Sequence, residues 1–203
     1  MENKKFADKT DRKELSQEVL WLKFIGGDNH AIDNIYRQNY QALFIYGQRF
    51  KIDTSTVEDT IQTLFINLFK YRKSLKEVKS VKAYIFRSFR NIILKQSSDL
   101  SIFSLIDNID TEEKNDTHDH EVLVYEVKKV MNDLSPRERE IILLKYFEDY
   151  KNDEIAEILG IENKTVRNLV TRALNRFRKT GKDKFIVISI LILTSKFFGR
   201  SKV

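Results

Sequence analysis

The chain contains no cysteine, and its 203 residues include only one proline, six glycines and three histidines. Without cysteine it can form no disulfide, no thiolate zinc site and no iron–sulfur cluster, and it has no cysteine nucleophile. Glycine and proline are too scarce for an all-β chain with many tight turns. The first 14 residues are highly charged and lack the apolar stretch of a secretory signal. These absences leave a helical protein without thiolate chemistry.

Charge is abundant instead, and it is unevenly distributed. Charged residues make up 33% of the chain, and the net charge of +6 suggests an anionic partner. Residues 15–96 carry thirteen basic against seven acidic side chains, net +6, whereas residues 97–121 carry one against eight, net −7. Residues 122–181 are nearly balanced at +2, and residues 182–203 return to +4. The order along the chain is therefore basic, acidic, mixed and basic.

The acidic stretch has weak apolar periodicity, which is typical of a linker between two helical modules. The alternative is a solvated loop inside one domain, but about 25 residues is unusually long for such a loop. We therefore expect an all-α protein of two small helical domains joined by this linker. The expected boundaries are a charged N-terminal segment 1–14, a first module 15–96, the acidic linker 97–121, a second module 122–181 and a C-terminal tail 182–203.

Apolar residues at spacings of three and four predict helices throughout the first module. The first helix ends at Gly26-Gly27, and Asp28 or Asn29 can cap the second. A third helix starts between Asp53 and Thr56, and a fourth runs from about Ser80 to Leu94. The third has an apolar face and a polar edge made by Glu58, Asp59, Gln62 and Asn67.

From Lys70 to Lys95 nine basic residues face a single acid, Glu77, and aromatic residues are interleaved among them. Basic and aromatic side chains together suit single-stranded nucleic acid, because cations attract phosphates and bases stack on rings. The alternative is that the aromatic residues are core and the lysines a solvated face. For Tyr84 and Phe89 the helical spacing favours the core.

The second module carries the pattern of a helix-turn-helix. Ser135, with Pro136 after it and Glu138 three residues on, predicts a capped helix start, and Asn152 can cap the next helix. Ala156 permits a close helix crossing, Gly160 tolerates a left-handed backbone and Val166 fills the angle between the helices. The helix after Gly160 has six basic residues and no acid between Asn163 and Thr180. A helix on the surface of an ordinary protein would mix signs, so we expect this one to bind the DNA major groove.

Taken together, these residues resemble the extracytoplasmic-function group of the sigma-70 family of bacterial transcription initiation factors, over about residues 20–180. The first module resembles the family in Gly27-Asp28, in Glu58-Asp59-x-x-Gln62-x-x-Phe65 and in Ala83-Tyr84-Ile85-Phe86-Arg87 followed by Arg90-Asn91. The second resembles it in Leu134-Ser135-Pro136-Arg137-Glu138-Arg139-Glu140, in Glu154-Ile155-Ala156 and in Thr165-Val166-Arg167 with Arg172-Ala173-Leu174.

The resemblance implies a sigma factor that binds core RNA polymerase and directs promoter-specific transcription initiation. The first module would correspond to region 2, which captures the melted −10 element, and the second to region 4, which reads the −35 element. The implied polymerase-binding residues are Glu58, Asp59, Gln62 and Phe65. The implied −10 DNA-binding residues are Lys73, Lys76, Lys79, Lys82, Arg87, Arg90 and Asn91. The implied −35 DNA-binding residues are Asn163, Lys164, Thr165, Arg167, Asn168, Thr171, Arg172 and Arg176.

The resemblance further implies a cytoplasmic protein with an anti-sigma partner. We expect no enzymatic activity, no cofactor and no small-molecule substrate, because no catalytic or phosphate-binding motif is present. We expect no metal site either, since His118 and His120 stand in the acidic linker. The competing reading is a helix-turn-helix activator with an N-terminal helical sensing or interaction domain. The apolar run from Phe185 to Leu193 is too short to cross a bilayer. We expect it to dock on an apolar surface of the protein or of a partner, and the alternative is an interfacial membrane anchor.

Overall fold

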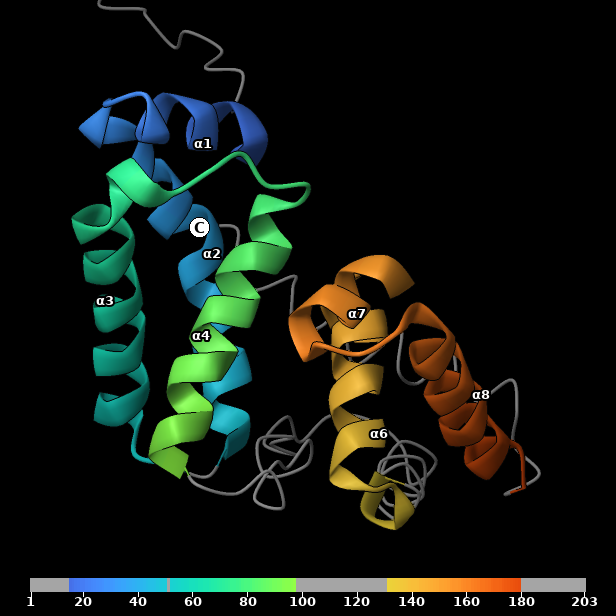
Figure 1. The fold of residues 1–203 in the computed structure, drawn as a ribbon. Coiled ribbons are helices and arrows are strands. Elements are labelled where there is room, and N and C mark those ends of the chain that lie inside the picture. Colours follow the sequence, from blue (N-terminus) through green and yellow to red (C-terminus); the bar gives the residue numbers. More distant parts are fainter. Residues whose placement is uncertain (1–14, 51, 98–130, 180–203) are drawn as a thin grey trace, which may run out of the picture.

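The computed structural model describes residues 15–50, 52–97 and 131–179, and the regular elements within these ranges are helical (Figure 1). The all-α prediction is confirmed for this part of the chain. The N-terminal segment, the acidic linker and the C-terminal tail fall outside the described residues, so the prediction that the tail docks is untested. Among the described helices, none is long and apolar enough to cross a membrane.

The described part of the first module consists of four α-helices joined by short turns. They are α1 (Gln17–Ile25), α2 (Asn29–Gly47), α3 (Thr54–Lys70) and α4 (Val81–Ser97), with 3-10 turns η1 (Gln48–Phe50) and η2 (Arg72–Ser74). Helices α2, α3 and α4 stand side by side, and α1 lies across one end of them (Figure 1). The predicted helix starts agree closely: Asp28 caps α2 by accepting a bond from the His30 amide, and Asp53 immediately precedes α3.

Large apolar side chains fill the space between these helices. Trp21, Phe24, Ile35, Leu43 and Phe89 are all 3% exposed or less. Burying each such side chain contributes about 1.5–3 kcal/mol, so this core accounts for the stability of the module. The expectation that Phe89 belongs to the core is confirmed.

The helices of the first module also approach one another closely, and a glycine makes this possible. A Cβ atom on Gly47 would lie 2.5 Å from Val57 Cγ1 and 3.1 Å from Phe89 Cζ. The first contact is shorter than real Cβ atoms allow and the second is tight, so the glycine permits the end of α2 to pack against α3 and α4.

The described part of the second module contains α6 (Pro136–Ile142), α7 (Asn152–Leu159) and α8 (Asn163–Lys179), and α6 continues as the π-helical turn η4 (Leu143–Phe147). The predicted capping box at Ser135 is present: its hydroxyl accepts from the Glu138 amide, and the Glu138 carboxylate accepts from the Ser135 amide at 2.9 Å. The prediction that Asn152 caps α7 is wrong by one residue. Lys151 occupies the cap position, and the Glu154 carboxylate accepts a bond from its amide at 2.9 Å.

Helices α7 and α8 form the predicted helix-turn-helix. Gly160 ends α7 with φ at +63°, a left-handed conformation that glycine adopts without steric cost. The Ile161 amide then donates to the carbonyl of Ala156, which closes the turn. Val166 and Ala173 are fully buried on the inner side of α8. The remaining face of α8 is therefore directed outward.

The two modules contact each other through α4, which packs against α7 (Figure 1). This arrangement was not expected from the sequence, which predicted two modules joined by a linker without a mutual orientation.

Candidate protein and nucleic-acid interfaces

The polar edge of α3 lies on the surface, as a protein-binding edge requires. Asp59 and Gln62 are exposed, and Ile66, one turn further on, leaves 63% of its surface in solvent. Glu58 is half-buried, and its carboxylate adds to the effect of burial in raising the pKa of Tyr40. A carboxylate, an amide and an apolar side chain in successive turns can contact one helix of a partner protein.

Phe65, the fourth predicted polymerase contact, is buried and not exposed on this edge. It is 8% exposed and packs edge-on against Tyr36, with 4.9 Å between the ring centroids. Its side chain therefore belongs to the core of the first module, and it supports the α3 edge from behind. The exposed apolar side chain of this edge is instead that of the next residue, Ile66. The sequence analysis missed it because the two residues are neighbours in the same helical turn.

A small aromatic and basic pocket follows α3. Its volume is about 280 Å³, and it is lined by Phe69, Lys70, Tyr71, Arg72, Lys73 and Ser74. Phe69 and Tyr71 are each about half exposed, and the Arg72 guanidinium lies 5.8 Å from the Phe69 ring centroid. Arg72 is held in place because it donates to the Asn29 side chain at 2.6 Å. Exposed rings beside cations can stack an unpaired base and hold its phosphate.

The chain between this pocket and α4 is attached to α1. The indole Nε1 of Trp21 donates to the carbonyl of Lys76 at 2.9 Å, and its ring packs edge-on against Tyr84 at 5.4 Å. Tyr84 is half-buried and packs against the core, so the expectation of a core role holds for it in part. The Trp21 bond fixes the backbone that carries the lysines of this segment.

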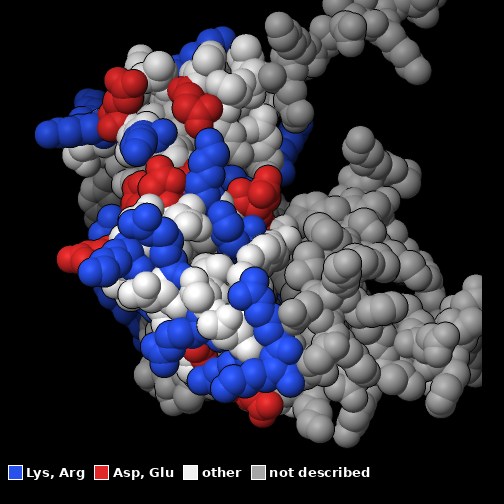
Figure 2. All heavy atoms as spheres, turned by 90° about the vertical axis from the view of Figure 1, so that its right-hand side faces the viewer, with Lys and Arg blue, Asp and Glu red and all other residues white. Residues whose placement is uncertain are grey.

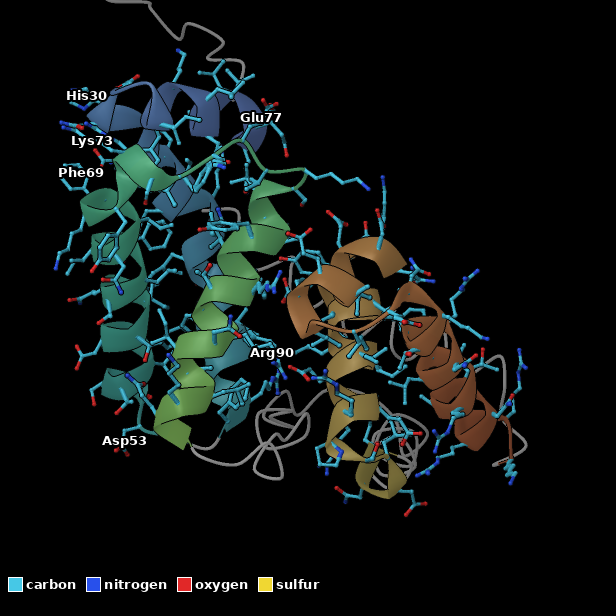
Figure 3. All side chains as sticks on the ribbon, viewed as in Figure 1. His30, Asp53, Phe69, Lys73, Glu77 and Arg90 are labelled. Carbon is cyan, nitrogen blue, oxygen red and sulfur yellow. The ribbon has the colours of Figure 1, made fainter. Side chains whose placement is uncertain are left out.

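The seven predicted −10 residues do not form one surface. Lys73 lines the pocket after α3, whereas Arg90 lies between the two modules (Figure 3). Lys73, Lys76, Lys79, Arg87 and Asn91 are exposed. Lys82 and Arg90 are held by the second module, and the exposed Lys79 forms a surface ion pair with Asp153 of that module.

Arg90 is the clearest departure from the expected open DNA surface. It is 6% exposed, and its guanidinium donates to both oxygens of Glu140, at 2.6 and 3.2 Å. Every fourth residue of α4 faces the same side, so Lys82, Phe86 and Arg90 point toward the second module while Arg87 and Asn91 lie on another face. In this arrangement Arg90 is not available to DNA.

The outward face of α8 is basic and open. Six of its predicted DNA-binding residues are exposed, namely Lys164, Thr165, Arg167, Asn168, Thr171 and Arg172, while Asn163 and Arg176 are half-buried. In Figure 2 Lys and Arg side chains gather over this helix, on the face of the second module that the view presents. The arrangement of a buried inner side and a basic outer side suits a helix that enters the major groove.

Two of these arginines also have a partner within the protein. The buried Glu138 carboxylate lies 3.8 Å from Arg172 and 3.6 Å from Arg176, and Arg176 donates to the carbonyl of Asp133. Glu138 is 1% exposed, so it attaches the second half of α8 to the start of α6. Arg172 remains 67% exposed and can still contact a phosphate.

Among the residues that the structure describes, no group of three histidine, aspartate or glutamate side chains is arranged to hold a metal ion. The His118 and His120 pair lies outside the described residues.

Two family models match the chain, one in each module. The model described as Sigma-70 region 2 matches residues 35–101, and the one described as Sigma-70, region 4 matches residues 125–177.

Similar proteins cover most of the chain. The RNA polymerase sigma factor SigZ of Bacillus subtilis is 25% identical over 153 residues, which is 73% of this chain and 85% of that protein. The RNA polymerase sigma-E factor of Streptomyces coelicolor is 22% identical over 161 residues, 75% of this chain and 87% of that protein.

Two solved structures share the fold. CnrH in complex with the cytosolic domain of CnrY has a TM-score of 0.59 at 17% identity, covering 83% of this chain and 98% of that one. The sigma factor RpoE from Bartonella quintana in complex with the anti-sigma factor NepR has a TM-score of 0.53 at 21% identity, covering 75% and 97%.

Proposed function

The chain belongs to the extracytoplasmic-function group of the sigma-70 family, and we propose that three of its surfaces, on α3, after α3 and on α8, each carry out one function of a sigma factor. The protein binds core RNA polymerase and directs promoter-specific transcription initiation. We assign polymerase anchoring to α3, the −10 element to the pocket and cations after α3, and the −35 element to α8.

The observation that carries this assignment is the exposed basic face of α8 in a helix-turn-helix. The N-terminal half of such a helix enters the groove, and its later turns run toward the backbone. We therefore assign Lys164, Arg167, Asn168 and Thr171 to the edges of the −35 bases. Asn163 and Thr165 lie at the entrance to the groove, and Arg172 and Arg176 hold phosphates.

The anchor on polymerase is the edge of α3 formed by Glu58, Asp59, Gln62 and the exposed Ile66. Charge-assisted hydrogen bonds across such an edge contribute about 1.5–3 kcal/mol each before desolvation. Phe65 holds the helix in position from the inside.

The −10 surface combines the pocket after α3 with the cations that follow it. Phe69 and Tyr71 provide exposed rings for an unpaired base, and Lys73, Lys76, Arg87 and Asn91 offer contacts to the strand. The exposed Lys79 can belong to this surface as it stands, whereas Lys82 and Arg90 join it only when they are released from the second module.

We propose the same module boundaries as the sequence suggests, 15–96 and 122–181, joined by the linker 97–121. The protein works in the cytoplasm, where polymerase is found, and it contributes no catalytic residue of its own. We also propose an anti-sigma partner, in keeping with the anti-sigma factor in the complex of RpoE. The promoters that the protein recognises determine which genes it controls.

Run-off transcription with purified core polymerase tests the function directly. We expect transcripts with a defined start from genomic promoter fragments when the full chain is added, and none from core polymerase alone. Transcripts that require a second, housekeeping sigma factor would instead support the activator reading. The match of the region 2 model to residues 35–101 argues against that reading, because a sensing domain would not carry it.

A further inference from the structure

The first turn of α6 presents one buried carboxylate, that of Glu138, to the neighbouring helix α8. The side chain is 1% exposed, and its Oε2 accepts bonds from the amide and the hydroxyl of Ser135 at 2.9 and 2.8 Å. The other oxygen, Oε1, is buried and accepts no hydrogen bond within the described residues. The cation beside it is Arg172 of α8, whose Nε lies 3.8 Å away. One oxygen of Glu138 therefore serves the capping box, and the other faces α8.

The two arginines of α8 next to this carboxylate are held in different ways. Arg172 approaches Glu138 with its Nε, and 67% of its side chain stays exposed. Its two Nη nitrogens, which form the fork that pairs with a phosphate, remain outside this ion pair. In Arg176, by contrast, Nη1 donates to the carbonyl of Asp133 and Nη2 lies 3.6 Å from Glu138. Arg176 therefore fastens α8 and adds mainly its charge to the DNA surface, whereas Arg172 is oriented with its fork outward.

This orientation comes from outside α8, because the helix has no acidic residue of its own between Asn163 and Thr180. Arg178 illustrates the difference, since it is exposed and donates to the Asn175 side chain of the same helix at 3.3 Å. Glu138 is instead buried and tied to Ser135, so it is a fixed point for the arginine that it faces. A long side chain that is oriented before binding loses less conformational freedom when it meets DNA.

A fixed phosphate contact also affects how the helix reads bases. Phosphate contacts set the register of a protein on the duplex, and base contacts within that register specify the sequence. Arg172 follows Arg167 by five residues on the exposed side of α8. A single orientation of Arg172 against the backbone therefore holds Arg167 and Asn168 at defined base pairs.

We propose that Glu138 is a positioning residue for −35 recognition, which holds Arg172 through its Nε so that the Nη fork meets one backbone phosphate. Glu138 contributes to sequence preference in this way without touching DNA. The role is separate from the capping box, which requires only an acceptor for the Ser135 amide. The inference rests on the proposed function, because it takes α8 as the helix that reads the −35 element.

Glu138→Gln isolates the charge from the cap, because glutamine also serves in a capping box. The test uses polymerase holoenzyme with the full chain, a promoter fragment identified by run-off transcription, and the same fragment with a scrambled −35 element. Glu138→Gln should lower affinity for the native fragment by about fivefold to tenfold, through the lost orientation of Arg172. Affinity for the scrambled fragment should not fall, because non-specific binding has no fixed register and the variant is more positive.

A double-mutant cycle shows whether Glu138 acts through Arg172. In the background of Arg172→Ala, Glu138→Gln should change affinity for the native fragment by about twofold or less. Arg172→Lys keeps the charge but has one ammonium in place of the Nε and the fork, so it should lose nearly as much affinity as Arg172→Ala.

The matched control is Asp149→Asn, which neutralises an exposed carboxylate of the same module. Asparagine tolerates the φ of +54° at this position as aspartate does, so the turn should be kept. This variant should retain the native preference between the two fragments. Thermal melts followed by far-UV circular dichroism show whether each variant is folded, and if Glu138→Gln is not, Arg172→Lys decides.

A selective loss of affinity for the native fragment, absent in the Arg172→Ala background, supports the positioning role. Native affinity in folded Glu138→Gln overturns it, and so does native affinity in Arg172→Lys. Equal losses on both fragments, or effects that add in the cycle, also overturn it, because they show that Glu138 only supports the packing of α6 on α8. If the unaltered protein does not distinguish the two fragments, the −35 assignment of α8 is itself wrong, and the positioning role is overturned with it. Failure of the proposed function is thus distinguishable from failure of the positioning role alone.

Discussion

Arg167 lies in the second turn of α8, where a recognition helix enters the groove, and it is exposed. Replacing it with alanine should reduce affinity for the cognate −35 duplex by about 1–3 kcal/mol and relax the sequence preference, because a contact to a base edge is lost. Selection from a randomised −35 library measures both effects. An unaltered preferred sequence would show that Arg167 does not read bases.

Arg178 is the natural comparison, since it is exposed near the end of the same helix. Arg178→Ala should weaken binding to all sequences alike and reduce the salt dependence of binding, because a phosphate contact releases counterions. The two variants thus separate base reading from backbone contact within one helix.

Asp59 tests the polymerase anchor. Its carboxylate is exposed on α3, so Asp59→Arg should leave the fold intact and reduce affinity for core polymerase tenfold or more, through like-charge repulsion and the loss of a charge-assisted bond. A fluorescence competition assay measures the change. Glu18→Arg makes the same charge change on the exposed side of α1, and it should have a much smaller effect.

Glu148 makes the stability of the protein depend on pH. It is 4% exposed, and burial raises the pKa of its carboxyl from about 4.5 to about 7, although Lys82 and Arg49 act in the opposite direction. The folded protein therefore keeps this proton up to about pH 7, while the unfolded chain loses it near pH 4.5. As pH rises through this window, the folded state loses up to about 3 kcal/mol of stability from this group.

We therefore expect Glu148→Gln to flatten the fall of the melting temperature between pH 5 and pH 8. Differential scanning calorimetry across this range measures the slope. Glu162→Gln, at an exposed site, should leave the slope unchanged. If the melting temperature of Glu148→Gln fell with pH as steeply as that of the native protein, a group other than Glu148 would be responsible for the pH dependence.

For single residues, the sequence predicts which polar side chains are exposed, but it predicts poorly which side chains are buried against another element. Asp59, Gln62 and Arg167 are exposed as expected, because each occupies the polar side of an amphipathic helix. Phe65 and Arg90 are buried. A motif shows that a residue is present but does not show which side of the helix it faces, and a buried arginine depends on a carboxylate 50 residues away.

The turn between α7 and α8 depends on Gly160. Its φ of +63° disfavours any side chain, although a Cβ atom there would meet nothing within 4 Å. Gly160→Ala should therefore cost about 1–2 kcal/mol of folding stability through backbone strain alone. Chemical denaturation measures this cost. Gly160→Asn should cost less, because asparagine tolerates the left-handed region better, and equal costs would point to a packing defect instead.

Helix boundaries could be predicted largely from local chemistry. The Ser135 capping box, the Asp28 cap and the Gly160 turn all act within a few residues, so they are visible in the sequence. The cap of α7 was misplaced by one residue because Asn152 is the better capping type, whereas Lys151 uses its backbone amide to bind Glu154. The π-helical turn at Leu143 had no local signature.

For the molecule as a whole, two modules could be predicted from the charge pattern, but their contact could not. The bonds that join them link residues 50 to 94 positions apart, and no periodicity of one helix reveals such a pairing. A basic α4 is equally suited to DNA and to the carboxylates of α6 and α7. Only the folded arrangement shows which partner it has in the free protein.

The single tryptophan of the chain, Trp21, is buried between α1 and the segment that carries Lys76, entirely within the first module. Its emission therefore reports the unfolding of that module alone, whereas far-UV circular dichroism reports helices of both. If the buried contact couples the modules, both optical transitions in urea should coincide for the native protein and separate for Glu140→Gln. The protein thus carries its own fluorophore for following one half of the molecule without a label.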